Sequence, residues 1–168
     1  MHIKSMLTIS VNLEWIKTLR DFPEPMAHEK TRDTPTPLDF LSAMPGYYIR
    51  RLQQIAVAVF LEETAEFGVT PVQFAALAAV ALTPGMDQRT LARTIGFDTS
   101  TIGGVVDRLE ARGLLRRQAS PDDRRVRLLE ATAAGQALLA DIEPAVRRAQ
   151  ERIVAPLPAD EQAQLMRM

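Results

Sequence analysis

The sequence predicts a mainly α-helical protein with one small β-hairpin, and three observations lead to this fold class. Apolar residues recur at helical spacing through most of residues 38–168. The helical period stops after Gly113, where two short strand candidates flank a loop that contains Pro121. The 168 residues are 46% hydrophobic and contain no internal repeat, which fits one domain with extensions.

The first long helix is expected over residues 38–67, with its beginning or a break near Pro45. Its apolar stripe consists of Tyr48, Leu52, Ile55, Val59 and Phe60. Gly68 should end this helix, and Pro71 should open the next one, because proline is well accepted at the first helical position. Pro84 closes that second helix.

Two short helices follow in close succession. The first is expected over residues 88–95, with Asp87 as its N-cap and a left-handed Gly96 just after its end. The second, capped by Asp98 or Thr99, runs to residue 112. Its apolar face consists of Ile102, Val105, Val106 and Leu109, and its other face carries the small or basic residues Ser100, Thr101, Gly103, Gly104 and Arg108.

A hairpin is expected next, with strands over residues 114–117 and 126–129 and a loop over residues 118–125. Helix, turn, helix and hairpin is the order of a winged helix-turn-helix, in which the second helix enters the DNA major groove. Residues 108–127 hold seven arginines and three acids, a local net charge of +4 on a chain whose net charge is −1. A local basic patch indicates nucleic-acid binding, although a solvated charged hairpin is the alternative interpretation.

The C-terminal part is helical again. Thr132 should cap a helix over residues 133–155, in which Pro144 should cause a kink or interrupt one backbone bond. A hinge at Pro156 leads to a last helix over residues 160–168. The helices at both ends have apolar stripes without a domain of their own, so we expect them to pack on each other and on a second copy of the chain.

The N-terminal part divides differently. Residues 1–37 form an extension, and its second half, residues 23–37, is a proline-rich linker. Met26 is a candidate for the original start, which makes the residues before it dispensable; an arm that packs on the dimer is the alternative. Residues 38–168 form the main domain, with the winged helix-turn-helix over about residues 70–132 and dimerisation helices over about residues 38–67 and 133–168.

Composition excludes several classes of function. The chain has no cysteine, and both of its histidines, His2 and His28, lie in the extension, so thiolate chemistry is excluded and a histidine metal site is not expected. No apolar run approaches the roughly 18 residues that a membrane helix needs, so a cytoplasmic protein without membrane contact is expected. No catalytic motif or cofactor motif is present, and we predict neither an enzyme nor a cofactor.

Residues 87–132 resemble the MarR family of bacterial transcription regulators. The matching residues are the helix run Ser100-Thr101-Ile102, Val106-Asp107-Arg108-Leu109-Glu110 and Gly113-Leu114, and the wing run Asp123-Arg124-Arg125, Ala131-Thr132 and Gly135. The wing fits the family pattern D-x-R-x5-L-T, except that Ala131 stands where leucine is usual. The resemblance extends over residues 38–168 and implies a two-fold dimer, built by the terminal helices, on a pseudo-palindromic operator in double-stranded DNA.

The resemblance also implies DNA-contacting residues. They are Ser100, Thr101, Gly103, Gly104 and Arg108 on the second short helix, and Asp123, Arg124, Arg125 and Arg127 in the wing. Many relatives carry larger side chains at the two glycine positions, so more of the specificity is expected in the wing and in DNA shape. Arg125 is expected in the minor groove, oriented by Asp123, which could alternatively pair with Arg108 or Arg112. Arg124 and Arg127 are expected to face the DNA backbone or solvent.

A small-molecule site is expected at the start of the first long helix. Its candidate residues are Tyr47, Tyr48, Arg50, Arg51 and Phe74. An arginine facing a carboxylate between aromatic walls suits a small aromatic or phenolic acid. Packing at the dimer interface is the alternative for each residue. The run PGYYIRRLQQIAVAVF also resembles regulators of aromatic-ring catabolism, including those for hydroxylated pyridine carboxylates.

These expectations combine into one hypothesis for the function. The chain is predicted to be a dimeric, sequence-specific DNA-binding regulator, a repressor whose DNA binding responds to a small aromatic acid. The alternative is a winged-helix module that binds another protein and has no operator.

Overall fold

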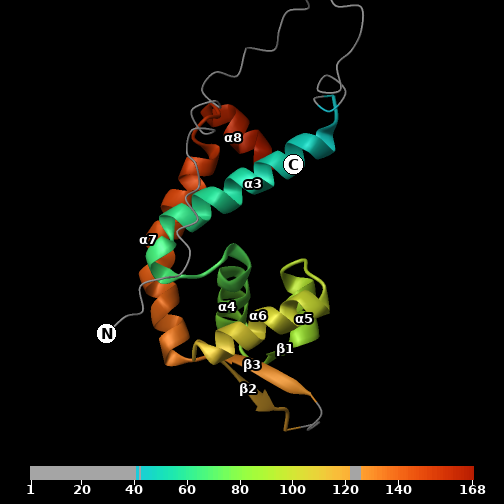
Figure 1. Ribbon diagram of the computed structural model, residues 1–168, viewed down its shortest axis with the longest axis vertical. Coiled ribbons are helices and arrows are strands. Elements are labelled where there is room, and N and C mark those ends of the chain that lie inside the picture. Colours follow the sequence, from blue (N-terminus) through green and yellow to red (C-terminus); the bar gives the residue numbers. More distant parts are fainter. Residues whose placement is uncertain (1–40, 42, 122–125) are drawn as a thin grey trace, which may run out of the picture. The chain divides into compact units, whose positions relative to one another are not determined.

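The computed structural model describes residue 41, residues 43–121 and residues 126–168. In chain order, these residues form α3 (Pro45–Glu63), the 3-10 turn η1 (Ala65–Phe67), α4 (Pro71–Leu82), β1 (Met86–Asp87), α5 (Gln88–Thr94), α6 (Thr99–Ala111), β2 (Leu115–Ala119), β3 (Arg127–Ala131), α7 (Ala133–Val154) and α8 (Ala159–Leu165). The predicted class, mainly helical with a small hairpin, is confirmed (Figure 1). The predicted extension over residues 1–37, with Met26, lies outside the described residues.

The observed helix boundaries follow from local sequence signals at the ends of each helix. α3 begins at Pro45, where a beginning or a break was expected, and it ends at Glu63, before the expected end at residue 67, with η1 following. Gly68 has a φ of 60° and ends η1 in the left-handed conformation. α4 has a capping box in which the Gln73 backbone N–H donates to Thr70 Oγ1 (3.3 Å) and the Thr70 backbone N–H donates to Gln73 Oε1 (2.9 Å).

The two short helices have carboxylate caps. Asp87 Oδ1 accepts from the Thr90 backbone N–H at 2.7 Å, and Asp98 Oδ1 accepts from the Thr101 backbone N–H at 2.8 Å. Asp98, rather than Thr99, is therefore the N-cap of α6. Gly96 turns the chain between the two helices with a φ of 71°, a value that side chains with a Cβ rarely adopt.

The sheet has three strands in the order β1-β3-β2, all antiparallel. In the hairpin, Leu115 pairs with Ala131 and Arg117 pairs with Leu129. The predicted strands were too short, and β1, which pairs Met86 with Leu129, was not predicted. Two residues are too few to establish an alternating pattern, which is why β1 leaves no signal in the sequence.

One core joins α4, α5, α6 and the hairpin. The predicted apolar face of α6 is completely buried there, together with Leu77, Val80, Leu91, Leu115 and Leu129. Leu138 and Leu139 at the start of α7 pack against this core from the side. Because the core takes up one whole face of α6, the opposite face is left to solvent.

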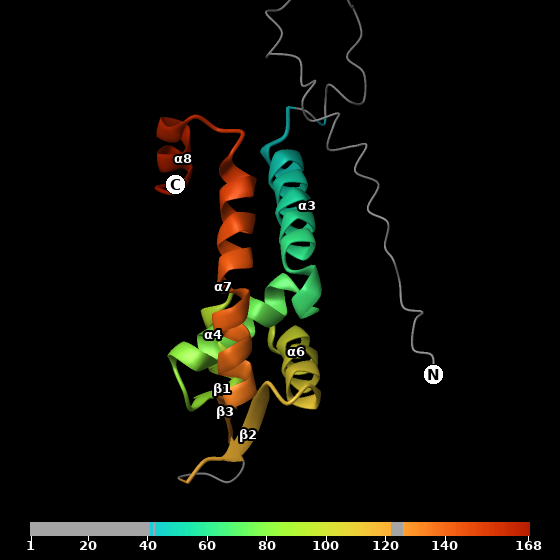
Figure 2. The same cartoon turned by 90° about the vertical axis from the view of Figure 1, so that its left-hand side faces the viewer.

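α3 and α7 lie side by side and extend away from the core (Figure 2). Arg148 Nε donates to Glu63 Oε2 at 3.0 Å, and Arg152 donates to Glu63 Oε1 at 2.5 Å and to Glu62 Oε2 at 3.0 Å. These hydrogen bonds lower the pKa of Glu63, Arg152 having the larger effect. α7 continues through Pro144 as one helix, so proline removes a donor without ending the helix.

Apolar side chains on α3 and α8 remain exposed in the single chain. They are Tyr48, Ile49, Leu52 and Leu61 on α3, with Leu165 and the nearby Met166 at the C-terminal end. The predicted packing on a second copy would cover such a surface. Among the described residues, no helix combines the length and the apolar character that crossing a membrane requires.

Candidate nucleic-acid interface

The first turn of α6 carries the predicted Ser100 and Thr101, and both are exposed. Ser100 Oγ donates to Asp98 Oδ1 at 2.5 Å, and Thr101 Oγ1 donates to Asp98 Oδ2 at 2.5 Å. These bonds, with the Thr101 backbone N–H, lower the pKa of Asp98 well below its ordinary range. Both hydroxyl hydrogens are thus held by the cap carboxylate, and the hydroxyl oxygens keep lone pairs free to accept.

The two glycines in the middle of α6 have different surroundings. A Cβ at Gly104 would lie 3.5 Å from Arg108 Nη1, an ordinary contact on the exposed face. A Cβ at Gly103 would lie 3.3 Å from Nε2 of Gln88, which belongs to α5. Gly104 therefore lies on the outer surface with Arg108, whereas Gly103 faces a neighbouring helix.

The basic side chains around α6 and the hairpin divide into two groups. Arg112 donates to the carbonyl oxygens of Gly68 (2.7 Å) and Phe67 (3.0 Å), and Arg116 pairs with Glu130 at 2.6 Å. Arg117 pairs with two acids of α6. These three arginines hold the fold together, which the charge count of the sequence could not reveal.

Arg108 and Arg127 make up the second group. Both are exposed, and neither makes a side-chain hydrogen bond or ion pair with a residue that the structure describes. The other predicted wing residues, Asp123, Arg124 and Arg125, lie outside the described residues, and so does the expected pairing of Asp123.

Arg117 was not predicted as a site residue. Its side chain is 23% exposed, Nη2 lies 2.6 Å from Asp107 Oδ1, and Nη1 donates to Glu110 Oε2. Burial acts against the charge of Arg117, but the hydrogen bonds to Asp107 and Glu110 outweigh it and raise its pKa. Strand alternation, which puts Leu115 and Arg117 on one face, was the available signal for this inward orientation.

The predicted small-molecule residues are only partly brought together. Tyr47, Arg50 and Arg51 line a surface pocket of about 160 Å³ with Gln54. Arg51 Nη1 donates to the Tyr47 hydroxyl at 3.3 Å. The Tyr47 ring meets the Tyr48 ring edge-on, with centroids 5.6 Å apart. The pocket therefore offers a phenol and two guanidiniums, and the predicted Tyr48 is not among the residues that line it.

Phe74 does not line this pocket. Its ring packs against Phe60 with centroids 5.8 Å apart, near the other end of α3. α4 begins shortly after α3 ends, with only the η1 turn between them. The first turn of α4, which holds Phe74, therefore lies beside the C-terminal end of α3, whereas the pocket lies at its N-terminal end. The prediction that Phe74 forms a wall of the same pocket is not met within one chain.

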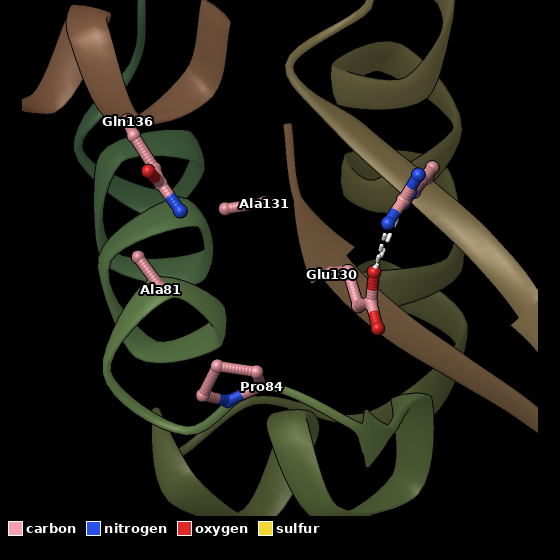
Figure 3. Close-up of a pocket in the computed structure, with 6 residues that line it drawn as sticks. Ala81, Pro84, Glu130, Ala131 and Gln136 are labelled. Carbon is pink, nitrogen blue, oxygen red and sulfur yellow. Dashed lines mark hydrogen bonds and ion pairs between the residues drawn. The ribbon is translucent and has the colours of Figure 1, made fainter. Parts of the chain in front are cut away.

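A second pocket, of about 310 Å³, lies between the end of α4, the outer face of the hairpin and the start of α7 (Figure 3). Ala81, Pro84, Ala131 and Gln136 line it with the Arg116–Glu130 pair. Glu130 Oε2 also accepts from Gln118 Nε2 at 2.9 Å. The charged groups of this pocket are thus already paired with each other, and no ligand is assigned to it.

Comparisons with known proteins agree with this arrangement. The MarR family model matches residues 67–126. The transcriptional repressor NicR of Pseudomonas putida is 30% identical over 82% of this chain and 90% of its own length. The repressor CouR, solved on a 23-mer DNA duplex, is 33% identical with a TM-score of 0.73, covering 80% of this chain and 96% of that chain; another structure of CouR gives its source as Rhodococcus jostii RHA1.

A third similar protein has a small-molecule ligand named with its structure. The Bordetella bronchiseptica protein BpsR, whose structure is described as the mechanism for regulation of its DNA binding by 6-hydroxynicotinic acid, is 27% identical with a TM-score of 0.72. The similarity covers 79% of this chain and 93% of BpsR. The whole arrangement of helices and hairpin, and not α5 and α6 alone, is therefore shared with these proteins.

Proposed function

This chain belongs to the MarR family, and we propose that it is a dimeric transcriptional repressor whose binding to operator DNA is modulated by a small aromatic carboxylate. The observation that carries the proposal is the division of α6 into two faces. One face is entirely buried in the core, and the other presents Ser100, Thr101 and Arg108, which bonds to no described side chain, to solvent. A recognition helix needs this combination of a fixed inner face and a polar, basic outer face.

The remaining DNA contacts are proposed from the wing. Arg127 is exposed at the start of β3, and the motif residues Asp123, Arg124 and Arg125 come just before it in the chain. We expect Arg125 in the minor groove and Arg124 and Arg127 at the backbone. CouR, solved on a DNA duplex, supports DNA as the partner.

Dimerisation is proposed through the two ends of the domain. The exposed apolar side chains of α3 and α8 would be covered by a second copy, and two copies of α6 would then meet a two-fold operator. Residues 1–37 are proposed to be an extension separate from this assembly. Starting the chain at Met26 should leave dimerisation and DNA binding intact.

The proposed effector site is the pocket of Tyr47, Arg50, Arg51 and Gln54. A guanidinium binds a carboxylate through paired hydrogen bonds, and the Tyr47 ring and hydroxyl suit an aromatic acid with a polar substituent. The regulation of BpsR by 6-hydroxynicotinic acid supports this class of ligand. Phe74 could join the site only from the second copy.

The DNA-binding part is tested by selection. Purified protein is incubated with random-sequence duplexes at 150 mM salt, and the bound DNA is amplified and sequenced. We expect a two-fold symmetric motif with half-sites about one helical turn apart. A dimer by light scattering with no enriched sequence after repeated rounds contradicts the proposal and favours the protein-binding alternative.

The effector part is tested on the enriched duplex. We expect 6-hydroxynicotinate or a hydroxybenzoate to change the gel shift and to raise the melting temperature, because a ligand that binds only the native state stabilises it. Arg50→Met and Arg51→Met should weaken this response while DNA binding without ligand persists. If both variants respond as the wild type does, the pocket assignment is wrong.

A further inference from the structure

We propose that Arg117 is a positioning residue. It sets the wing, which is the hairpin of β2 and β3, against the recognition helix α6, and it makes no contact with DNA. This inference rests on the proposed DNA-binding function. It concerns a residue that the basic charge of the hairpin would otherwise assign to DNA, since Arg117 is one of the seven arginines between residues 108 and 127.

The side chain of Arg117 joins β2 to α6 through two carboxylates. Nη2 bonds Asp107 Oδ1 at 2.6 Å, and Nη1 bonds Glu110 Oε2. The other oxygen of Glu110, Oε1, accepts from the Arg117 backbone N–H at 3.2 Å. Glu110 thus holds both the main chain and the side chain of Arg117, which fixes the position of the strand as well as the guanidinium.

A third element, α5, reaches the same place. Gln88 Oε1 lies 3.5 Å from Arg117 Nη2, and Gln88 Nε2 donates to the Thr99 carbonyl oxygen at 3.4 Å. Gly103 leaves room for this side chain, because its missing Cβ would lie 3.3 Å from Gln88 Nε2. Gly103, Asp107 and Glu110 follow one another at helical spacing, so one edge of α6 is shaped to receive Arg117 and Gln88.

The neighbouring Arg116 provides a contrast. It lies on the opposite face of β2 and pairs with Glu130 of β3, so its bonds remain within the hairpin. Arg116 and Arg117 have the same charge and adjacent positions. Of these two arginines, only Arg117 bonds to α6, so the loss of Arg117, and not that of Arg116, should change the angle between the wing and α6.

The charges of Asp107 and Glu110 make the inference testable. Two carboxylates on a helix that lies in a DNA groove are electrostatically unfavourable, and their neutralisation alone should strengthen DNA binding. If their role is to hold Arg117, neutralisation should weaken operator binding, because the wing then loses its fixed position. Pure electrostatics and positioning therefore predict effects of opposite sign.

The experiment uses the full chain, a duplex enriched by the wild type from random DNA, and an unrelated duplex of equal length. Affinities are measured across a salt series for Arg117→Met, Arg117→Lys, Arg116→Met and the double variant Asp107→Asn with Glu110→Gln. Melting temperature and dimerisation are measured alongside. The enriched duplex reports on positioning, and the unrelated duplex reports on charge.

Arg117→Met is expected to bind the enriched duplex about tenfold more weakly or worse, the effect of losing about one base contact per site. Its slope of log affinity against log salt should equal that of the wild type, since no phosphate contact is lost. Arg117→Lys should not restore binding, because one ammonium cannot reproduce the fork to two carboxylates. The double amide variant should also lose operator affinity, and Arg116→Met should change it less than about threefold.

Besides wild-type binding by Arg117→Met, two results would overturn the inference. The first is a salt slope reduced by about one unit for each Arg117 in the complex, with equal losses on both duplexes, because that marks a phosphate contact. The second is a double amide variant that binds the enriched duplex as tightly as the wild type or more tightly. If Arg117→Met fails to fold, the isosteric amide variant decides the question.

Failure of the proposed function would look different. If the wild type enriches no sequence, DNA recognition itself is wrong, and this inference falls with it. If enrichment succeeds and Arg117→Met binds like the wild type, the positioning role alone is wrong and the proposed function stands.

Discussion

The carbonyl oxygen of Leu114 occupies the space where a side chain at Gly135 would begin. A Cβ built on Gly135 would lie 2.2 Å from this oxygen and 3.1 Å from Leu77 Cδ1. The carbonyl is held in place by the Thr132 backbone N–H, which donates to it at 3.0 Å. The start of α7 therefore packs directly against the main chain that enters the hairpin, and only glycine permits this approach.

Gly135→Ala should destabilise the protein by about 1–3 kcal/mol, the usual cost of overpacking a core. The added methyl group cannot move away, because its nearest neighbour is backbone rather than the end of a flexible side chain. For a chain of this size, the melting temperature should fall by about 2–4 °C for each kcal/mol. Thermal unfolding by circular dichroism measures this effect.

Gly104→Ala is the matched control for that change. Gly104 also lies in a helix, but its Cβ would make an ordinary contact of 3.5 Å with Arg108 Nη1. Alanine there should stabilise the protein by about 0.4–1 kcal/mol, because it reduces the freedom of the unfolded chain. Equal effects of the two alanines would show that helix propensity, and not the contact with Leu114, determines the cost at position 135.

Most of the helical fold could be predicted from local signals. The caps Asp87, Asp98 and Thr132 each accept a backbone bond in the structure, and the apolar face of α6 is buried as its spacing predicted. These features depend on neighbours within one or two turns, which the sequence shows directly. β1 was missed because its pairing with Leu129 depends on a partner far along the chain.

The site was predicted less completely, for the same physical reason. Counting charges cannot separate Arg108, whose side chain is exposed and bonds to no residue that the structure describes, from Arg112 and Arg117, whose guanidiniums bond within the fold. Nor could helical spacing show that Phe74 packs on Phe60 rather than beside Tyr47. The partners of these arginines and of Phe74 depend on how the helices and the hairpin pack against one another, and this packing is set by contacts between residues far apart in the sequence.

The acid stability of the protein should depend on Asp98. Hydrogen bonds from the Ser100 hydroxyl and from Thr101 lower its pKa in the folded chain below the ordinary value of 3.8. A lowered folded pKa means that this contribution to stability is fully present well above the unfolded value of 3.8, starts to decrease as the pH falls to that value, and is lost as the pH falls on through the folded pKa. The melting-temperature difference between wild type and Asp98→Asn should therefore shrink below about pH 4.

The role of Asp98 can also be tested by removing the Ser100 hydroxyl, which donates a hydrogen bond to it. Ser100→Ala removes the largest cause of the lowered pKa, so its stability should depend less on pH than that of the wild type between pH 2 and pH 5. Melting curves over this range, with both variants in the same buffers, test the assignment. A difference between wild type and Asp98→Asn that grows as the pH falls would contradict it.

Pro144 offers a test of the long α7 helix. The proline is exposed and lies inside a continuous helix, where it cannot donate the usual backbone bond. Pro144→Ala should stabilise the protein by about 1–3 kcal/mol, as measured by chemical denaturation. Loss of the dimer in this variant would instead mean that the backbone conformation at Pro144 shapes the dimer surface.

Arg108 lies in the last turn of α6 and Arg112 is its C-cap, four residues later, yet they should behave in opposite ways. The Arg108 guanidinium is exposed and bonds to no described residue, whereas the Arg112 guanidinium holds the carbonyl oxygens of Phe67 and Gly68. Arg108→Ala should therefore reduce DNA binding and leave stability unchanged. Arg112→Ala should reduce stability by about 0.5–1.5 kcal/mol, because two backbone carbonyls lose a donor.

The salt dependence of binding separates the two cases. If each Arg108 of a dimer neutralises one phosphate, Arg108→Ala should reduce the slope of log affinity against log salt by roughly two units per dimer. Arg112→Ala should keep the wild-type slope when measured well below its melting temperature. A reduced slope for Arg112→Ala together with a wild-type slope for Arg108→Ala would mean that Arg112, and not Arg108, faces the DNA backbone.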